Sequence, residues 1–462
     1  MPLMKTISGF RGTLGHPDGN NLTPLNTVGF AAAYGKWLKE SSGKDRPKMV
    51  VGRDARISGP MIQGIVVNTL IGMGVDVVDL GLSTTPTVEV AVPLEDAQGG
   101  IILTASHNPK EWNALKMLDH NGEFLNGVEA AKIIEWADAG TFDWVGVDDL
   151  GEVTQIDDYI ERHVNMVLEL PYVNLEAIRG ANFKVVVDGV NSTGGIAVPM
   201  LLRRLGVEVI ELYCEPTGHF PHNPEPLAAH LTDLSDAVIK EGAHLGITVD
   251  PDVDRLAFMS EDGKMFGEEY TLVAVADYLL ARTPGVAVSN LSSSRALQDV
   301  AEKHGGRRIA SMVGEVNVVQ AMKDNNAVIG GEGNGGIIYP GLHYGRDALI
   351  GIVYFMSLLA EHGGTTSELR ATYPDYHMSK QKIQLTPSLN PDEVLSTMAE
   401  AYAGENVTDI DGVKIDFDKS WVHMRKSNTE PIIRVYTEAP TQQEADALAH
   451  RFMSEIAEKV GV

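Results

Sequence analysis

Short apolar runs alternate with helix-length segments along most of the chain, and this alternation constrains the fold more than any other feature. Residues 48–51 and 75–80 are typical strands, and 60–73 between them is typical of a helix. A further apolar run follows at 100–103. A strand–helix–strand rhythm favours a mostly parallel sheet covered by helices. We therefore expect an α/β fold.

The same rhythm restarts twice further along the chain. A strand and turn at 184–189 precede a helix at 195–205, and a strand at 285–290 precedes a helix at 294–303. Domains usually hold about 100–200 residues, so three or four are expected in this chain. The sequence therefore predicts three α/β units, and 157–170 is expected to be a helical connector after the first.

The C-terminal part of the chain has a different pattern. Strand-like runs at 412–417, 421–425 and 432–436 are followed by one helical segment at 442–460. Strands followed by a helix are typical of a small α+β domain. We place the four domains at 1–156, 157–258, 259–374 and 375–462.

The charge balance and the cysteine count exclude several classes of protein. The formal net charge of −26 disfavours nucleic-acid and anionic-membrane partners, which need a basic face. Cys214 is the only cysteine, so no intramolecular disulfide forms, as in a reducing compartment. The longest uncharged run, 57–75, contains Gly, Pro, Gln and Asn and does not resemble a membrane span. Residues 1–6 show no signal-peptide pattern. We expect a cytoplasmic protein.

Residues 104–109, Thr-Ala-Ser-His-Asn-Pro, directly follow the apolar run at 100–103. Ser106 therefore lies at the carboxyl end of a strand, where open α/β sheets bind their ligands. An ordinary loop closed by an Asn-Pro turn is the alternative.

Residues 250–255, Asp-Pro-Asp-Val-Asp-Arg, place three carboxylates at every second position after an apolar strand. Carboxylate oxygens suit a hard divalent cation, and such closely spaced charges repel one another without one. A solvated acidic turn is the alternative. An EF-hand is excluded, because its sixth position must be Gly and here is Arg255, and because the flanking residues predict strands.

Two further loops carry polar groups suited to a sugar phosphate. Residues 331–336, Gly-Glu-Gly-Asn-Gly-Gly, formally match a dinucleotide fingerprint, but Pro340 prevents the helix that must follow. Glu332 and Asn334 instead suit sugar hydroxyls, and a plain glycine turn is the alternative. Residues 425–431 offer Arg425 with hydroxyl, amide and backbone donors, which suits a phosphate. A hairpin loop with a charged face is equally compatible.

Taken in order, these four loops make the sequence resemble the α-D-phosphohexomutase family over essentially its whole length. They resemble the family's phosphoserine, metal, sugar and phosphate loops. Residues 8–13 resemble its opening segment, and 51–54 a further signature. The resemblance implies three similar mixed α/β domains plus a smaller C-terminal α+β domain around a central cleft. It assigns the four loops to the four domains in turn.

The loops also depart from the common family pattern. Pro251 and Val253 stand where the metal loop commonly has Gly, and Asn334 and Gly336 where the sugar loop commonly has Ser and His. His343 is a candidate to supply the imidazole. These variants resemble the archaeal-type phosphoglucosamine mutases more than the common bacterial phosphomannomutases. Asn428 is evidence against a phosphoglucosamine mutase, because many bacterial members of that class have Gly at this position.

The resemblance implies a mechanism and its residues. Phosphoserine at Ser106 and one Mg²⁺ ion, held by Ser106, Asp250, Asp252 and Asp254, would interconvert hexose 6-phosphate and hexose 1-phosphate through a hexose 1,6-bisphosphate. Arg11 and Arg255 would spread charge, and His107 and Lys116, the latter in an Asn-Ala-Leu-Lys run, are acid–base candidates. The substrate-binding candidates are Glu332, Asn334, His343, Arg425, Ser427, Asn428, Thr429 and, more weakly, Arg434.

Several alternatives share parts of this pattern. Glucosamine phosphate is the expected substrate, and a phosphoglucomutase/phosphomannomutase with the same site is the alternative. A metal- or sugar-phosphate-binding protein without turnover would not need Ser106 beside basic groups. A phosphoserine phosphatase would carry its aspartate nucleophile early in the chain, unlike Asp250. The expected partner is a small-molecule sugar phosphate, and the protein is expected to be a monomer or homodimer.

Overall fold

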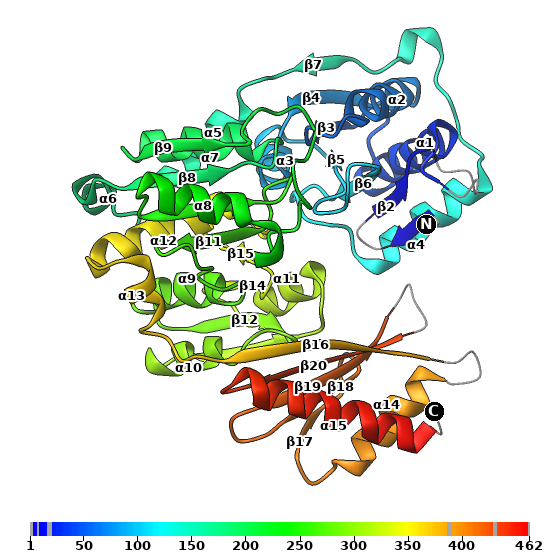
Figure 1. Ribbon diagram of the computed structural model, residues 1–462. Coiled ribbons are helices and arrows are strands. Elements are labelled where there is room, and N and C mark those ends of the chain that lie inside the picture. The colour runs from blue at the N-terminus through cyan, green and yellow to red at the C-terminus, as the bar shows by residue number, and fades with distance from the viewer. Residues whose placement is uncertain (1–2, 7–8, 16–20, 386–389, 428–431, 461–462) are drawn as a thin grey trace. The chain divides into compact units, whose positions relative to one another are not determined.

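The computed structural model describes residues 3–6, 9–15, 21–385, 390–427 and 432–460 (Figure 1). The chain forms two compact units. The first comprises Met1–Leu279 and Asn334–Glu368, and the second comprises Leu280–Gly333 and Leu369–Val462. None of the described helices is long and apolar enough to cross a membrane.

The first sheet of unit one has seven strands in the order β1-β2-β6-β5-β3-β4-β7. The neighbouring strands β5, β3, β4 and β7 are parallel, whereas the pairs β1–β2, β2–β6 and β6–β5 are antiparallel. The expectation of a mostly parallel sheet is therefore wrong for the part of the sheet that β1, β2, β6 and β5 form. The strands are β1 (Met4–Thr6), β2 (Gly9–Thr13), β3 (Lys48–Arg53), β4 (Asp76–Leu82), β5 (Gly99–Leu103), β6 (Trp112–Leu118) and β7 (Val153–Gln155).

Helices cover both faces of this sheet and bury its apolar side chains. Phe30, Leu38 and Ile62 contribute to one core cluster, and Val88 and Val92 contribute to a second cluster on the other side. Their burial provides the main stabilisation of the layers. The elements are α1 (Pro24–Ser42), α2 (Gly59–Gly72), α3 (Thr85–Leu94), α4 (Gly127–Ala139) and the 3₁₀ turn Val147–Asp149.

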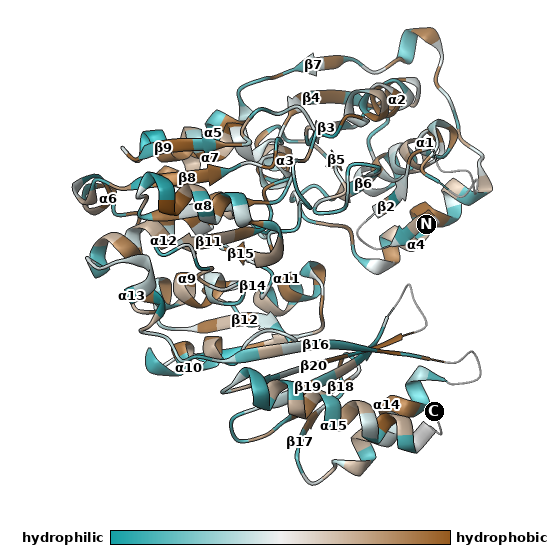
Figure 2. Cartoon of the chain, in the orientation of Figure 1, coloured by the Kyte–Doolittle hydropathy of each residue, from teal (hydrophilic) through white to brown (hydrophobic). Residues whose placement is uncertain are grey.

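The second sheet of unit one has the order β11-β10-β8-β9, in which only the β10–β11 pair is antiparallel. Its strands are β8 (Lys184–Asp188), β9 (Glu208–Leu212), β10 (Leu245–Val249) and β11 (Leu256–Ser260). The other elements here are α5 (Tyr159–Leu168), α6 (Leu175–Ala181), α7 (Gly194–Arg204), a 3₁₀ turn at Ala228–His230, α8 (Thr232–Glu241), α9 (Tyr270–Leu280), β15 (Gly336–Ile338), α12 (Ala348–His362) and α13 (Thr366–Arg370). In Figure 2 the central strand β8 is mostly brown, as its burial requires.

Unit two contains parallel strands in the order β13-β12-β14 and an antiparallel sheet in the order β16-β20-β19-β18-β17. Figure 1 shows α15 running along this second sheet, and an apolar cluster that includes Phe452 and Ile433 fills the space between them. The predicted C-terminal α+β arrangement is confirmed. The elements are β12 (Val286–Asn290), α10 (Ala296–Lys303), β13 (Arg307–Ser311), α11 (Glu315–Asp324), β14 (Ile329–Glu332), β16 (His377–Gln384), α14 (Pro391–Ala401), β17 (Asn406–Thr408), β18 (Val413–Asp416), β19 (Trp421–Lys426), β20 (Ile432–Ala439) and α15 (Gln442–Val460).

Candidate active site

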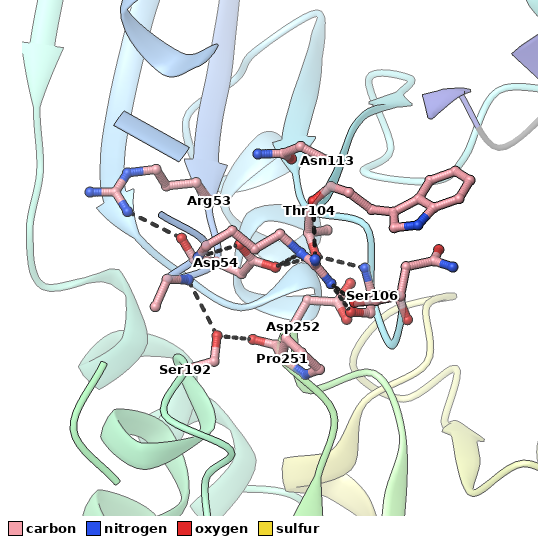
Figure 3. A network of polar contacts seen from close by, with 12 residues as sticks. Arg53, Asp54, Thr104, Ser106, Asn113, Ser192, Pro251 and Asp252 are labelled. Atoms are coloured by element: carbon pink, nitrogen blue, oxygen red, sulfur yellow. Dashed lines mark hydrogen bonds and ion pairs between the residues drawn. The ribbon is translucent and has the colours of Figure 1, made fainter. Parts of the chain in front are cut away.

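Ser106 lies in a tight turn just beyond the end of β5. Its φ of 50° is in the left-handed region, which a non-glycine residue adopts only when its surroundings hold it there. Ser106 N donates to Thr104 Oγ1 at 2.9 Å, and Thr104 Oγ1 donates to Asp54 Oδ2 at 2.7 Å (Figure 3). The hydroxyl donates to Asp250 Oδ2 at 2.7 Å. The backbone thus aims Ser106 at the aspartate loop.

Arg56, which the sequence did not single out, anchors the Ser106 loop. Its fully buried side chain pairs with Asp54 at 2.9 Å. Nη1 donates to the carbonyls of Pro109 and Trp112 at 2.7 and 3.0 Å. Nη2 donates to the carbonyls of Ser106 and Asn108. One guanidinium therefore satisfies four carbonyls of the loop, a geometry that the planar fork of arginine permits and lysine does not.

The aspartate loop 250–255 joins the antiparallel strands β10 and β11, and three of its consecutive carbonyls accept hydrogen bonds from other segments. The Pro251 carbonyl accepts from Ser192 Oγ at 2.6 Å (Figure 3). The Asp252 carbonyl accepts from Thr85 N at 2.8 Å, and the Val253 carbonyl from Ala348 N at 3.2 Å. Val253 has a φ of 66°, which costs energy for a β-branched residue and persists only because these contacts fix the loop. The flanking strands also confirm the exclusion of an EF-hand.

The three aspartates gather as the spacing predicts. They are fully buried, and one oxygen of each lies within 4.8 Å of the others. Asp252 Oδ1 and Asp254 Oδ1 are buried and have no hydrogen-bond partner among the described residues. Burial and the neighbouring Asp252 and Asp254 raise the pKa of Asp250 well above its ordinary value. Unpartnered carboxylate oxygens in a buried cluster of three aspartates fit a divalent cation.

Four cationic side chains surround the carboxylates. Lys116 Nζ lies 2.7 Å from Asp252 Oδ2 and 3.5 Å from Asp254 Oδ2, and Arg346 Nη2 lies 2.8 Å from Asp254 Oδ2. Arg11 donates to Asn108 in the Ser106 loop at 2.8 Å. Arg255 pairs with Glu225 at 3.3 Å, while its buried Nε has no partner within the described part of the chain. The cations concentrate positive charge beside Ser106 within an acidic protein.

The two acid–base candidates have opposite protonation preferences. Burial and the nearby Arg255 and Arg11 lower the pKa of His107 to about 2, so the imidazole is neutral. Its Nδ1 lies 3.3 Å from Ser106 Oγ. Burial alone would lower the pKa of Lys116, but Asp252 and Asp254 outweigh it and raise the pKa. His107 is therefore a neutral hydrogen-bond partner of Ser106 and a weak base in this environment, whereas Lys116 remains an ammonium ion.

The candidate sugar-binding residues differ in their hydrogen-bond partners. Glu332 ends β14 in unit two and accepts from Asn290 Nδ2 at 2.9 Å and Gly314 N at 3.1 Å. Asn334, in unit one, accepts from Gly336 N at 3.2 Å. The His343 side chain is 7% exposed, with its ring nitrogens 3.3 Å from Glu89 and 3.2 Å from Asp347. Burial would lower the pKa of His343, but these two carboxylates raise it to about 10.

The candidate phosphate loop lies on the C-terminal sheet. Arg425 on β19 and Arg434 on β20 are direct cross-strand partners. Like charges in this position are destabilising unless an anion lies between them. Arg425 Nη1 makes a long contact of 3.9 Å with Asp411. Ser427 N donates to the Ile432 carbonyl at 3.0 Å, and Asn428 and Thr429 lie outside the described residues.

A strand-end serine beside buried carboxylates and several cations, on doubly covered α/β sheets, defines a phosphoryl-transfer enzyme. The chain matches the four domain models of the phosphoglucomutase/phosphomannomutase family: α/β/α domain I at residues 4–143, domain II at 157–263, domain III at 267–376 and the C-terminal domain at 388–455. The chain therefore belongs to the phosphoglucomutase/phosphomannomutase family and is a phosphohexomutase. The predicted family, fold class and enzyme class are confirmed, and a binding protein without turnover is disfavoured.

The family assignment is supported by three similar proteins. A phosphoglucomutase/phosphomannomutase of Thermococcus kodakarensis is 35% identical over 92% of each chain. A protein of Methanopyrus kandleri named "Probable phosphoglucosamine mutase" is 33% identical over 96% of each chain. The crystal structure of a phosphoglucomutase/phosphomannomutase family protein from Burkholderia thailandensis superposes with a TM-score of 0.83 at 25% identity, covering 99% of this chain and 98% of that one.

Proposed function

We propose that this enzyme interconverts glucosamine 6-phosphate and glucosamine 1-phosphate through a phosphorylated Ser106 and a hexose 1,6-bisphosphate. The contact between Ser106 Oγ and Asp250 Oδ2, at 2.7 Å, carries the proposal. It places the hydroxyl directly beside the three carboxylates that fit a cation. A phosphoserine adds about −1.5 to −2 charge, which needs that cation and the surrounding basic groups.

The proposed reaction transfers one phosphoryl group at a time. The bond between Ser106 Oγ and phosphorus breaks, phosphorus bonds to the free sugar hydroxyl oxygen, and the hydroxyl proton passes to a base. The bisphosphate then reverses its orientation. Its other phosphoryl group returns to Ser106 Oγ, and the released sugar oxygen takes up a proton. The enzyme ends phosphorylated, as it began.

Each charged group has a role in this reaction. Mg²⁺ held by Ser106, Asp250, Asp252 and Asp254 would neutralise charge on the transferring group. Arg11 and Arg255 stabilise the remaining charge, and Lys116 holds Asp252 in place. His107, neutral and 3.3 Å from Ser106 Oγ, orients that hydroxyl, and His107, Lys116 and His343 are the candidates for the base that takes the sugar hydroxyl proton.

The remaining site residues bind the rest of the substrate in this proposal. Glu332 and Asn334 bind sugar hydroxyls, with His343 as a further candidate. Arg425, Ser427, Asn428, Thr429 and Arg434 hold the phosphate that does not react. The opposed Arg425 and Arg434 support this role, because a bound phosphate relieves their repulsion.

The choice of glucosamine rests on the sugar loop and on the Methanopyrus relative, whereas the Thermococcus relative supports the alternative, a phosphoglucomutase/phosphomannomutase. Coupled assays with glucosamine 6-phosphate, glucose 1-phosphate and mannose 1-phosphate compare the candidates directly. We expect the highest kcat/KM for glucosamine phosphate. A tenfold higher kcat/KM for either other sugar, equivalent to about 1.4 kcal/mol, reverses the choice.

We also propose a cytoplasmic location and a monomeric or homodimeric assembly. A phosphorylated metabolite and a single cysteine fit a cytoplasmic enzyme. The prediction of a monomer or homodimer stands as stated and is tested by light scattering of the purified chain.

A further inference from the structure

Arg346 reaches the aspartate loop from a rigid position in unit one. It lies between β15 and α12. The next residue, Asp347, donates through its N–H to the Ile337 carbonyl at 2.8 Å. Asp347 Oδ1 accepts from Leu349 N at 2.8 Å and caps α12. These contacts fix the backbone from which the Arg346 side chain extends, and only 10% of that side chain is exposed.

The guanidinium of Arg346 occupies one side of the Asp254 carboxylate. Arg346 Nη2 donates to Asp254 Oδ2 at 2.8 Å, and Lys116 adds a longer contact of 3.5 Å to the same oxygen. Asp254 Oδ1 is buried and has no hydrogen-bond partner among the described residues. Arg346 therefore fixes the rotation of the carboxylate so that Oδ1 is the oxygen left for a cation.

The path of Arg346 to Asp254 is open only because residue 336 is glycine. A Cβ at position 336 would lie 2.3 Å from Arg346 Cδ and 3.0 Å from Cγ, far inside van der Waals contact. The same Cβ would lie 3.2 Å from Asn334 Oδ1, a milder approach. The space beside Gly336, in the candidate sugar loop, is thus filled by the stem of Arg346.

We infer that Arg346 is a positioning residue of the cation site, which holds the Asp254 carboxylate in the orientation that binds the metal. Gly336 leaves the space that the Arg346 side chain needs to reach Asp254. This inference rests on the proposed function, which places a divalent cation at Asp250, Asp252 and Asp254. It joins the sugar loop to the metal loop through one side chain. Hydrogen-bond partners of metal ligands typically contribute about 10–100-fold to metal affinity or activity.

The test compares Arg346→Ala, Gly336→Ala and the double variant, with Arg204→Ala as control, since Arg204 pairs with Glu161 on the surface. Electron paramagnetic resonance of free Mn²⁺ measures cation affinity without substrate, and the Mg²⁺ concentration for half-maximal turnover gives a second readout. Each single variant should weaken Mn²⁺ binding by about 10–100-fold. The double variant should be no weaker than Arg346→Ala alone, because the added Cβ then meets no arginine stem.

The outcomes separate the inference from the function on which it rests. Mn²⁺ binding by Arg346→Ala at the parent's affinity, or additive losses in the double variant, overturns the inference while leaving a divalent-dependent mutase intact. A parent protein that neither binds Mn²⁺ nor needs Mg²⁺ overturns the cation site itself. If Arg346→Ala does not fold, Arg346→Lys, which keeps the charge with one donor nitrogen, should still bind Mn²⁺ more weakly than the parent.

Discussion

Replacing Arg56 by methionine should damage both stability and turnover, because this side chain ties the Ser106 loop to the first sheet. The substitution leaves Asp54 buried without its cation, which by itself costs about 3–5 kcal/mol. It also removes the donors of four loop carbonyls. Bonds that act as one network do not add, so we expect a total near 5 kcal/mol rather than their sum.

Two measurements separate the effects of Arg56 on stability and on turnover. At about 2–4 °C per kcal/mol, differential scanning fluorimetry should show a loss of roughly 10–20 °C in Tm. Turnover measured well below the new Tm should still fall about 100-fold, since a shift of about 1 Å at a reacting group has that effect. Arg56→Lys, which keeps a charge facing Asp54, should recover more stability than turnover. A Tm within 3 °C of the parent and turnover within threefold for Arg56→Met would refute this account of the loop.

Three other substitutions test the metal loop, the phosphate loop and a buried histidine. Asp252→Asn keeps the size of the side chain and removes a charge from the cation site. Turnover should therefore be lost while the circular dichroism spectrum is unchanged. Near-normal activity of the variant without added divalent ion would exclude the metal-binding role of Asp252. Arg425→Ala should raise KM for both the 1-phosphate and the 6-phosphate, whereas lower stability with unaltered kinetics would favour a hairpin face without substrate. Burial lowers the pKa of His423 to about 4. Between about pH 4 and 6.5 the unfolded chain therefore binds a proton that the folded chain does not, so the stability decreases as the pH is lowered through this window. The loss of stability between pH 7 and pH 5 should be about 2 kcal/mol. The Tm of the parent and of His423→Gln at both pH values measures this loss. An equal fall in Tm for the two proteins would contradict the role of His423.

The α/β layers could be predicted from local patterns, but part of the first sheet could not. Strands such as β3 and β8 are short apolar runs next to helix-length segments, and their apolar composition predicts burial on both faces. The buried strand β6 was missed because Asn113 and Lys116 interrupt its apolar residues. Its antiparallel pairing with β2 joins segments about one hundred residues apart, such as Phe10 and Leu115, and no local pattern encodes that contact.

The candidate site follows the same division between local and long-range information. The strand-end loops that hold Ser106 and Asp250 could be found because their residues are contiguous. Arg56 and Arg346 could not, because they act across 50 and 92 residues of sequence, on Ser106 and Asp254 respectively. Arg56 follows the signature 51–54 by two residues and Arg346 follows the sugar loop 331–336 by ten, yet the role of each depends on where the fold directs the guanidinium.

The most direct test of the whole account is the intact mass of the parent protein and of Ser106→Ala, each after incubation with hexose 1,6-bisphosphate. The substitution removes one buried hydroxyl and its hydrogen bond to Asp250, so stability should fall by about 0.5–1.5 kcal/mol. The parent should show a fraction heavier by one phosphoryl group, and Ser106→Ala should show none and should lose turnover by several orders of magnitude. A Ser106→Ala protein that keeps the phosphoryl mass, or that turns over at the parent rate, would contradict the central claim.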